Sequence, residues 1–496
     1  MSLDVLASPS TMVCGLMMVF MIFDVVSGLT ASSSSMQLAV NTLLCPVACQ
    51  CTVVPGSERR IAADCDRPIN HDERFDPQTE VVHVTGNCHR SLVSVMASVG
   101  SLAAPRELSL RRCHLYSVEQ LTSAGDAVNW DTVFDLDVGF NLITRVIDRA
   151  FVKMPSLRTL VMRHNRIETI QQSAFDGLNE LVKLDLTGNR LSMLTPIDMR
   201  WICSLRSLDE LSLRDNGVHV LAAAAFHCRS KPCPLQRLDL GENRIRRVED
   251  DAFIGLSNVT RLNLDSSQLT VVPTRALVRL STSLEELDMS GNQLDALLTH
   301  SFHDLSALRV LRLSRILTLQ FVDRNCFDNM SSLERVELSG NSALKYVDRE
   351  AFINVPNIAD ISLAGCRLFA VDRQLVDTLT SLKSLDLRLN PISCDCHTKW
   401  MRLSNIITVD VDVWKQCKDN DTNGTGCSPQ IAALFNSELD VQLTDTFTLH
   451  CHAVGSPSPL ITWRLPSSLD NNSSAEVQYC FITVFNTFLP FVGLLT

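Results

Sequence analysis

The central part of this 496-residue chain repeats one short pattern of leucines. The pattern L-x-x-L-x-L-x-x-N-x-L occurs in twelve successive copies, with steps of 24 to 28 residues. The stretch LVKLDLTGNRL at 181–191 matches it at every fixed position. Twelve copies in a row exclude coincidence, so the chain must fold as a stack of similar units. The copies begin at residues 105, 133, 157, 181, 208, 235, 259, 284, 308, 333, 358 and 382.

Each copy contains the alternating segment L-x-L, which predicts a short strand with its leucines pointing inward. The asparagine that follows is expected to turn the chain and to hydrogen-bond backbone groups of neighbouring copies, forming a ladder. Cys113 and Cys366 stand at this position in two copies, an exchange that such repeats allow. Ser267 and Ile316 stand there in two others, and we expect those turns to be less regular.

A phenylalanine recurs after a small residue in seven copies. We expect these rings to stack as a spine beneath the convex side of the array. No single copy can bury its own apolar edge, so the stack needs several copies and capped ends. The phenylalanines are Phe151, Phe175, Phe226, Phe253, Phe302, Phe327 and Phe352.

Cysteines gather at both ends of the repeated segment. The run CPVACQC at 45–51 and a fourth cysteine precede it, and NPISCDC at 390–396, Trp400 and two further cysteines close it. These groups resemble the N- and C-terminal flanking modules of extracellular leucine-rich-repeat proteins, and the resemblance covers roughly residues 45–427. In that family the first cysteine of a cap pairs with the third and the second with the fourth. The pairs that the resemblance implies are Cys45–Cys51, Cys49–Cys65, Cys394–Cys417 and Cys396–Cys427.

A zinc site is the competing interpretation of such cysteine clusters, but the supporting histidines are absent. Eighteen cysteines also favour an oxidising compartment. The expected fold is therefore an α/β leucine-rich-repeat solenoid with a curved parallel sheet, an irregular or short-helical convex side and disulfide caps. The N-terminal cap and a degenerate first repeat occupy 45–104, the twelve repeats 105–392, and the C-terminal cap 390–427.

Two cysteine and strand features lie outside this regular pattern. A weak strand signal at Val82, Val84 and Asn87 is expected to complete the N-terminal cap. Two repeats with three extra residues each hold Cys203, Cys228 and Cys233. We expect one local bridge among these three, and their spacing does not decide which two pair.

The N-terminus has the composition of a secretory signal peptide, which we place at 1–31. Residues 12–23 form an apolar run too short to span a bilayer, and small residues follow through Ala31. A signal anchor is the alternative, because the first ten residues contain Asp4 and no lysine or arginine. An extracellular chain, secreted or held at the cell surface, is expected. Sequons for N-glycosylation fit this route: Asn258, Asn329, Asn420, Asn423, Asn471 and Asn472.

The composition changes after the second cap. Residues 428–480 resemble the first half of an I-type immunoglobulin domain, with Trp463 twelve residues after Cys451. Tyr479-Cys480 stands out of register with the late-strand motif of that family, so a partial all-β domain is expected. His450 and His452 flank Cys451 on the opposite strand face, and we expect no metal there.

The segment 481–496 is an apolar tail too short for a transmembrane helix. The small residues 473–475 before it faintly resemble a lipid-anchor signal. A membrane anchor is thus not demonstrated by the sequence.

Curved solenoids use the exposed strand positions of the concave side as their default binding surface. An acidic residue recurs between two strand leucines in alternate copies, and arginines lie nearby. We predict a mixed-charge surface with an acidic stripe for a protein ligand that carries basic side chains. The alternative is that aspartate is simply common in such strands and stays solvated. The candidates are Asp137, Asp185, Asp239, Asp288, Glu337, Asp386, Arg163, Arg214, Arg237, Arg261, Arg312 and Arg335.

Other function classes find little support. The net charge of −11 disfavours nucleic acid, and the basic run Arg244, Arg246 and Arg247 is interpreted as a solvated rim. A phosphate loop, G-x-S-x-G and H-E-x-x-H are all absent from the sequence, and the 12 histidines are scattered. We therefore expect neither an enzyme nor a cofactor.

Leucine-rich repeats followed by an immunoglobulin domain resemble the Lingo, Lrig and kekkon type of cell-surface protein. The resemblance implies roles in cell adhesion, neural guidance or receptor regulation, through an extracellular or cell-surface protein ligand. Homophilic and co-receptor association both stay open. Two rival readings are the front of a peroxidasin-like extracellular haem peroxidase and an innate immune repeat receptor of the Toll type.

Overall fold

The computed structural model describes residues 44–53, 61–70, 72–86, 88, 92–229, 232–392 and 398–415. It also gives the backbone of five strands between residues 430 and 489. The first of its two compact units, Met1–Leu43, lies outside the described residues, and with it the expected signal peptide. The same holds for Asn87, His450, residues 473–475 and the sequons at Asn420, Asn423, Asn471 and Asn472.

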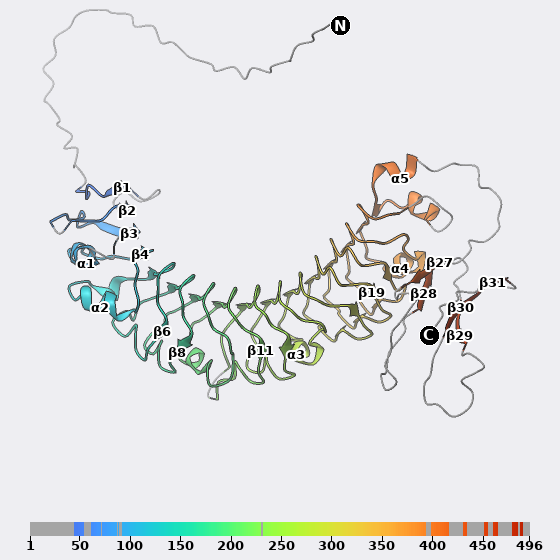
Figure 1. Cartoon of the computed structure of the whole chain (residues 1–496), viewed down its shortest axis with the longest axis horizontal. Coiled ribbons are helices and arrows are strands. Elements are labelled where there is room, and N and C mark those ends of the chain that lie inside the picture. Colours follow the sequence, from blue (N-terminus) through green and yellow to red (C-terminus); the bar gives the residue numbers. More distant parts are fainter. Residues whose placement is uncertain are drawn as a thin grey trace, which may run out of the picture. The chain divides into compact units, whose positions relative to one another are not determined.

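One sheet runs through the whole repeated segment of the described chain. Its sixteen strands are hydrogen-bonded in chain order, β1 antiparallel to β2 and all later neighbours parallel. Figure 1 shows these strands on the inner, concave side of the curved array. The strands are β1 (Cys49–Val53), β2 (Ile61–Cys65), β3 (Thr79–Thr85), β4 (Glu107–Arg111), β5 (Asp135–Asp137), β7 (Thr159–Val161), β9 (Lys183–Asp185), β10 (Glu210–Ser212), β12 (Arg237–Asp239), β14 (Arg261–Asn263), β15 (Glu286–Asp288), β18 (Val310–Arg312), β21 (Arg335–Glu337), β24 (Asp360–Ser362), β25 (Ser384–Asp386) and β26 (Ile407–Thr408).

The chain returns from each strand through turns, two- to three-stranded ribbons and short helices. The ribbons are β6 (Arg145–Val146) with β8 (Thr169–Ile170), β11 (Val220–Leu221) with β13 (Arg247–Val248), β16 (Ala296–Leu297) with β19 (Phe321–Val322) and β22 (Tyr346–Val347), and β17 (Phe302–His303) with β20 (Phe327–Asp328) and β23 (Phe352–Ile353). The helices are α1 (Leu92–Val99), α2 (Glu119–Ala124), α3 (Thr274–Val278), α4 (Arg373–Thr378) and α5 (Val411–Lys415), with 3₁₀ turns at Trp130–Thr132, Arg200–Ser204 and Lys399–Leu403. The expected solenoid architecture is present.

Strand alternation decides what is buried. In each three-residue strand of the sixteen-stranded sheet the central side chain points into the core, and from Leu136 to Leu385 it is at most 2% exposed. The residues on either side of it are half-buried or exposed on the concave side. Each strand therefore offers two side chains to solvent. Equivalent side chains of neighbouring strands are separated by the interval between parallel strands, about 4.8 Å.

The predicted asparagine ladder is confirmed. The Nδ2 of Asn189 donates to the carbonyls of Met162 (3.1 Å) and Leu186 (2.8 Å), and its Oδ1 accepts from the Ile167 amide (3.0 Å). Each buried amide thus satisfies backbone groups of its own copy and of its neighbours. The buried ladder asparagines are Asn141, Asn165, Asn189, Asn216, Asn243, Asn292, Asn341 and Asn390.

In the copies without asparagine, the backbone groups at this position find other hydrogen-bond partners or none. The thiol of Cys366 donates to the Leu338 carbonyl at 3.3 Å. Ile316 has no polar side chain, and its amide donates instead to Oδ1 of Asn341 at 2.7 Å. The Oγ of Ser267 is buried without a hydrogen-bond partner in the described structure. The ladder therefore lapses at Ser267, one of the two turns expected to be less regular.

The phenylalanine spine is also confirmed. Ring centroids lie 5.7 Å apart between Phe302 and Phe327 and 4.6 Å apart between Phe327 and Phe352, with nearly parallel planes. Phe151 and Phe175 stack at 5.7 Å, and Trp201 continues this part of the spine edge-on at 5.2 Å. The rings fill the space between the sheet and the convex side.

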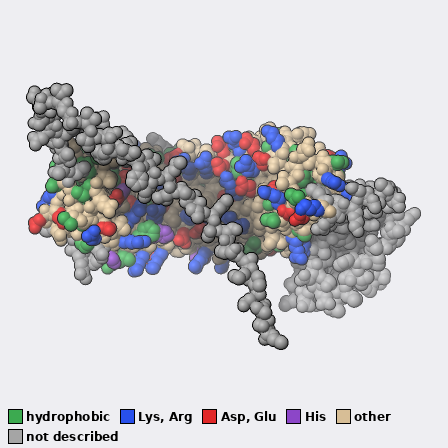
Figure 2. All heavy atoms as spheres, turned by 90° about the horizontal axis from the view of Figure 1, so that it is seen from above, with side chains coloured by type: hydrophobic (Ala, Val, Ile, Leu, Met, Phe, Trp, Pro, Cys, Tyr) green, Lys and Arg blue, Asp and Glu red, His purple; other side chains and the backbone are tan. Residues whose placement is uncertain are grey.

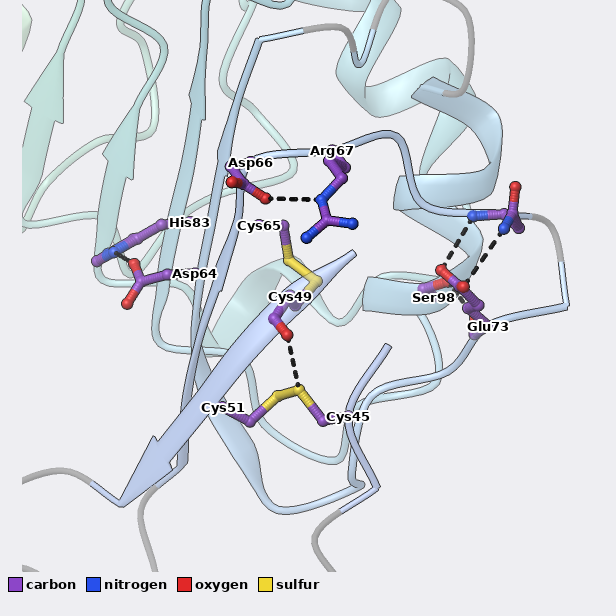
Figure 3. The surroundings of a disulfide bond; sticks show 11 residues. Cys45, Cys49, Cys51, Asp64, Cys65, Asp66, Arg67, Glu73, His83 and Ser98 are labelled. Carbon is purple, nitrogen blue, oxygen red and sulfur yellow. Dashed lines mark hydrogen bonds and ion pairs between the residues drawn. A yellow bond between two sulfur atoms is a disulfide. The ribbon is translucent and has the colours of Figure 1, made fainter. Parts of the chain in front are cut away.

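Disulfides close the N-terminal end of the array. Cys45 is bonded to Cys51 and Cys49 to Cys65 (Figure 3), the pairing that the family resemblance implies. Strand β3 contains the expected residues Val82 and Val84 and extends the sheet from β2 to β4. Its His83 bridges Asp64 and Glu107 on the two neighbouring strands, at 2.9 Å each. The cysteines of the C-terminal cap (Cys394, Cys396, Cys417 and Cys427) lie outside the described residues.

Two further disulfides join neighbouring copies. The structure pairs Cys203 with Cys228 and leaves Cys233 as a buried free thiol, which settles the bridge that spacing left open. Cys113, expected only to replace a ladder asparagine, is bonded to Cys88 of the N-terminal cap. Sequence analysis missed this bond. It ties the cap to the first full repeat.

The C-terminal part carries two small antiparallel sheets. One pairs β27 (Gln430–Ala433) with β28 (Cys451–Val454), and the other joins β29 (Leu460–Arg464), β30 (Tyr479–Val484) and β31 (Thr487–Leu489). These strands do not establish an immunoglobulin domain, which stays a prediction. None of the described helices is long and apolar enough to cross a bilayer.

Candidate ligand-binding surface

A shallow pocket of about 610 Å³ lies on the concave side. It spans six successive strands of the sheet, from β9 to β18, and is lined by the outward-pointing residues on either side of each buried leucine. Figure 2 looks onto this side from above and shows acidic and basic side chains interspersed over it. The charged lining residues are Lys183, Asp185, Glu210, Arg237, Asp239, Arg261, Glu286, Asp288 and Arg312.

Opposite charges on adjacent strands pair across the pocket floor. Lys183 contacts Glu210 at 2.7 Å, and Arg261 contacts Glu286 at 3.1 Å. Glu286 is also 3.3 Å from Arg312 on the next strand. These side chains are all partly exposed, so each pair contributes only about 0–1 kcal/mol to stability. Their larger effect is to hold the side chains in fixed positions. This lowers the conformational entropy that these side chains lose when a ligand binds.

The structure brings half of the sequence candidates together in this pocket: Asp185, Asp239, Asp288, Arg237, Arg261 and Arg312. Arg214 lies directly beside Asp239, at 3.5 Å. Asp137 and Arg163 lie toward the N-terminal end of the same sheet, and Arg335, Glu337 and Asp386 toward its C-terminal end. Of the sequons within the described chain, Asn258 and Asn329 are both exposed.

The recurring aspartates have a structural role that the sequence did not separate from ligand binding. One carboxylate oxygen of each accepts the backbone amide two residues later, at 2.8 Å for Asp137 and 3.1 Å for Asp386. The same bond occurs at Asp185, Asp239 and Asp288 at 2.9 Å. This bond stabilises the turn after the strand, which explains why aspartate recurs there. Some oxygens of the expected acidic stripe are therefore already hydrogen-bonded to turn amides or paired with neighbouring arginines, and are not free for a ligand.

Arg214 contacts three carboxylates, more than any other described arginine on the concave side. Its guanidinium contacts Asp265 at 2.7 and 3.2 Å, Glu242 at 2.7 Å and Asp239 at 3.5 Å. Burial alone would raise the pKa of Asp265, but hydrogen bonds from Arg214 and Ser266 hold it below its ordinary value. Burial raises the pKa of Asp239 despite the Gly241 amide and Arg214. The network lies beside Ser267, where the ladder lapses.

Sequence analysis missed the carboxylates that complete these pairs: Asp209, Glu210, Glu242, Asp265 and Glu286. A usable signal was present, because opposite charges stand at matching positions of neighbouring copies. The basic run at Arg244, Arg246 and Arg247 is exposed, as a solvated rim would be. In the described part of the chain, no cluster of three or more histidine, cysteine or acidic side chains is arranged to hold a metal ion.

The fold and the repeat pattern define this chain as a leucine-rich-repeat solenoid. The family model for leucine-rich repeats matches residues 133–191, 233–294 and 306–368. These stretches cover nine of the repeat copies with their concave strands, six of which carry a ladder asparagine.

Curated relatives are repeat proteins of the cell surface or extracellular space. Chaoptin of Drosophila melanogaster is 26% identical over 240 residues, covering 47% of this chain and 15% of chaoptin. Tsukushi of Mus musculus is 28% identical over 231 residues, with 41% and 64% covered. The human leucine-rich repeats and immunoglobulin-like domains protein 1 is 28% identical over 191 residues, with 38% and 16% covered. The chain thus spans less than two thirds of each of these relatives.

A solved complex of latrophilin 3, Unc5D and FLRT2 contains a similar chain. The likeness has a TM-score of 0.43 at 20% identity and covers 74% of this chain and 92% of the other.

Proposed function

We propose that this protein is an extracellular or cell-surface binding module whose concave repeat face holds a protein ligand. The observation that carries the proposal is the 610 Å³ pocket, whose charged side chains come from six strands and mostly form cross-strand ion pairs. A pre-ordered, chemically varied surface of this kind suits a folded partner with complementary charges. Four disulfides in the described chain support an oxidising, extracytoplasmic environment.

Cell adhesion, neural guidance and receptor regulation are the roles we propose, on the strength of the Lingo, Lrig and kekkon resemblance. A non-enzymatic role agrees with the repeat class of the curated relatives. The peroxidasin-like and Toll-type readings are the alternatives. A haem peroxidase domain encoded downstream in the full transcript would establish the first, and a cytoplasmic signalling domain the second.

Reversing two pocket arginines is expected to abolish ligand binding. Arg237→Glu with Arg261→Glu places carboxylates beside Glu210 and Glu286, and each reversal should weaken binding by about tenfold or more. The arginines are better targets than Asp239 and Asp288, because those aspartates also hold turns. The full chain, made as a multivalent Fc fusion, is screened against an array of purified extracellular domains.

The matched control for this reversal is Arg309→Glu. Arg309 makes a comparable exposed ion pair with Glu334, at 2.8 Å, but does not line the pocket. A partner bound by the wild type and by Arg309→Glu, and lost in the double reversal, supports the concave face. Equal binding by all three proteins, or no partner among the domains, counts against it.

A further inference from the structure

A compact basic and aromatic cluster lies outside the pocket, at the N-terminal end of the concave sheet. We call Arg112, Phe140, Arg163 and His164 the rim patch. The rings of Phe140 and His164 stack with centroids 4.7 Å apart. The guanidinium carbons of Arg112 and Arg163 lie 5.5 and 5.7 Å from the centre of the Phe140 ring. One phenylalanine therefore holds two cations and an imidazole around it.

The backbone holds these side chains at the surface. Arg112, Phe140 and His164 stand directly before the ladder position in three successive copies, each with a positive φ of 52° to 57°. This left-handed conformation is unfavourable for residues with a Cβ, by roughly 1–2 kcal/mol. Four other copies place glycine there, Gly188, Gly291, Gly340 and Gly365, and five place another side chain at a positive φ: Asp215, Glu242, Ser266, Arg315 and Leu389. Phe140 is 36% exposed, a large fraction for a phenylalanine. Other copies fold with glycine at this position, so the repeat does not require an aromatic side chain there.

The arginines of the rim patch differ from most arginines of the concave side, although Arg315, at the position equivalent to Arg112, also has no carboxylate partner among the described residues. Arg111, Arg214, Arg237, Arg261, Arg312, Arg335 and Arg388 each contact a carboxylate. Neither Arg112 nor Arg163 has such a partner among the described residues, and the Nε of Arg163 is buried without an acceptor. Arg163 occupies the same position of its copy as Arg214. Arg214 forms its ion pair with Asp265, which stands at the same position two copies further on. Two copies beyond Arg163 the equivalent residue is Arg214, which cannot neutralise a second arginine.

A buried N–H without an acceptor costs about 1–3 kcal/mol, and nothing on the protein compensates the Arg163 guanidinium for it. Because the Nε itself is buried, a ligand carboxylate would meet the other N–H groups of this half-buried side chain. Two guanidinium groups present planar N–H donors that match a carboxylate. The exposed ring between them adds an apolar contact, and aromatic and arginine side chains dominate the energetics of protein interfaces. A polyanion would need a long basic row, whereas this patch has two arginines in a chain of net charge −11.

We propose that the rim patch binds a carboxylate side chain in an acidic segment of a protein ligand, with an apolar neighbour of that carboxylate against Phe140. The inference builds on the proposed binding function but uses different residues from the pocket, since the pocket begins at β9. The rim patch gives the ligand a second, charge-selective contact at one end of the concave face.

The test uses the full chain and a library of short random peptides displayed on phage. Peptides are selected on the wild type after depletion on the double variant Arg112→Ala/Arg163→Ala. Surviving peptides are expected to be rich in aspartate or glutamate next to an aromatic or aliphatic residue. A synthetic copy should bind Arg163→Ala and Phe140→Ala about tenfold or more weakly than the wild type. A selection without acidic enrichment, or equal binding by these variants, overturns the proposal.

Three controls keep the outcome interpretable. Arg335→Ala removes a concave arginine that is already paired with Asp360, and it should leave peptide binding unchanged. Thermal unfolding checks that the rim variants are folded. The pocket variant Arg237→Glu/Arg261→Glu should also retain the peptide. Loss there, with retention in Arg163→Ala, would refute the rim patch while leaving the concave-face function standing. Capture of a heparin fragment instead of acidic peptides, lost in Arg163→Ala, would likewise overturn the protein-carboxylate assignment.

Discussion

Replacing Phe327 by alanine is expected to lower the free energy of unfolding by about 3–5 kcal/mol. Its ring is fully buried and stacks on Phe302 and Phe352 of the two adjacent copies. The substitution leaves a cavity that neither neighbour can fill, because both rings are held in their own positions of the spine. Urea unfolding of the purified chain, followed by circular dichroism, measures the change.

The control for Phe327 is Ile353→Ala, a residue of β23 whose side chain is 38% exposed and should matter little. Because each copy contacts mainly its neighbours, the damage should also be local. Hydrogen exchange is expected to quicken in the copies that hold Phe302 and Phe352 and to stay slow near Phe151. An unchanged free energy of unfolding would contradict the structural role of the spine.

Arg214→Ala is expected to destabilise the protein by about 3 kcal/mol, and Gly241→Ala by less, through the same contact. Arg214 reaches Asp265, 51 residues later, by crossing the copy that contains Gly241. A methyl group at Gly241 would overlap both Asp265 Oδ1 and Arg214 Nη1, so alanine must displace these two side-chain ends. Arg214→Ala leaves the Asp265 carboxylate, which is 12% exposed, without its main partner, and Gly241→Ala weakens the same contact.

The two substitutions should not be additive, since both act on one interaction. The double variant is expected to unfold with nearly the same free energy as Arg214→Ala alone. Gly217→Ala is the matched control, because the nearest atom to its added Cβ is a backbone oxygen at an ordinary 3.7 Å. Losses that simply add in the double variant would show that Gly241 acts independently of the Arg214 pair.

The elements that follow from local periodicity could be predicted from the sequence. The L-x-L spacing specifies a strand, the asparagine specifies the ladder, and the phenylalanine after a small residue specifies the spine. Each of these depends on a residue and its equivalents in adjacent copies. The strand at Val82 and Val84 was predicted for the same reason, although its copy is degenerate.

Interactions that skip a copy or leave the pattern could not be predicted. The Arg214–Asp265 contact crosses one intervening copy and depends on the absence of a side chain at Gly241, which periodicity does not reveal. Cys113 fits the ladder position so well that its bond to Cys88 went unnoticed. Spacing alone also cannot orient Cys228 toward Cys203 rather than Cys233, because bond formation depends on how the Cβ atoms point.

The candidate surface was predicted in outline and not in its chemistry. The strand positions of Asp185 and Asp239 were identified from the repeat, but their hydrogen bonds to following backbone amides were not. Nor did the sequence separate Arg163, which lacks a carboxylate partner among the described residues, from Arg214, which has three. The distinction depends on which residues lie one and two copies away.

Carboxylate footprinting of a complex tests the concave-face proposal most directly. A partner found in the domain screen is bound to the full chain, and exposed acidic side chains are labelled with a carbodiimide and quantified by mass spectrometry. We expect Glu210 and Glu286, which line the pocket, to become protected. Asp250 and Asp251, which pair with Arg275 and Arg279 at α3, should label as in the free protein. Protection of Asp250 and Asp251 with unchanged labelling of Glu210 and Glu286 would contradict the account.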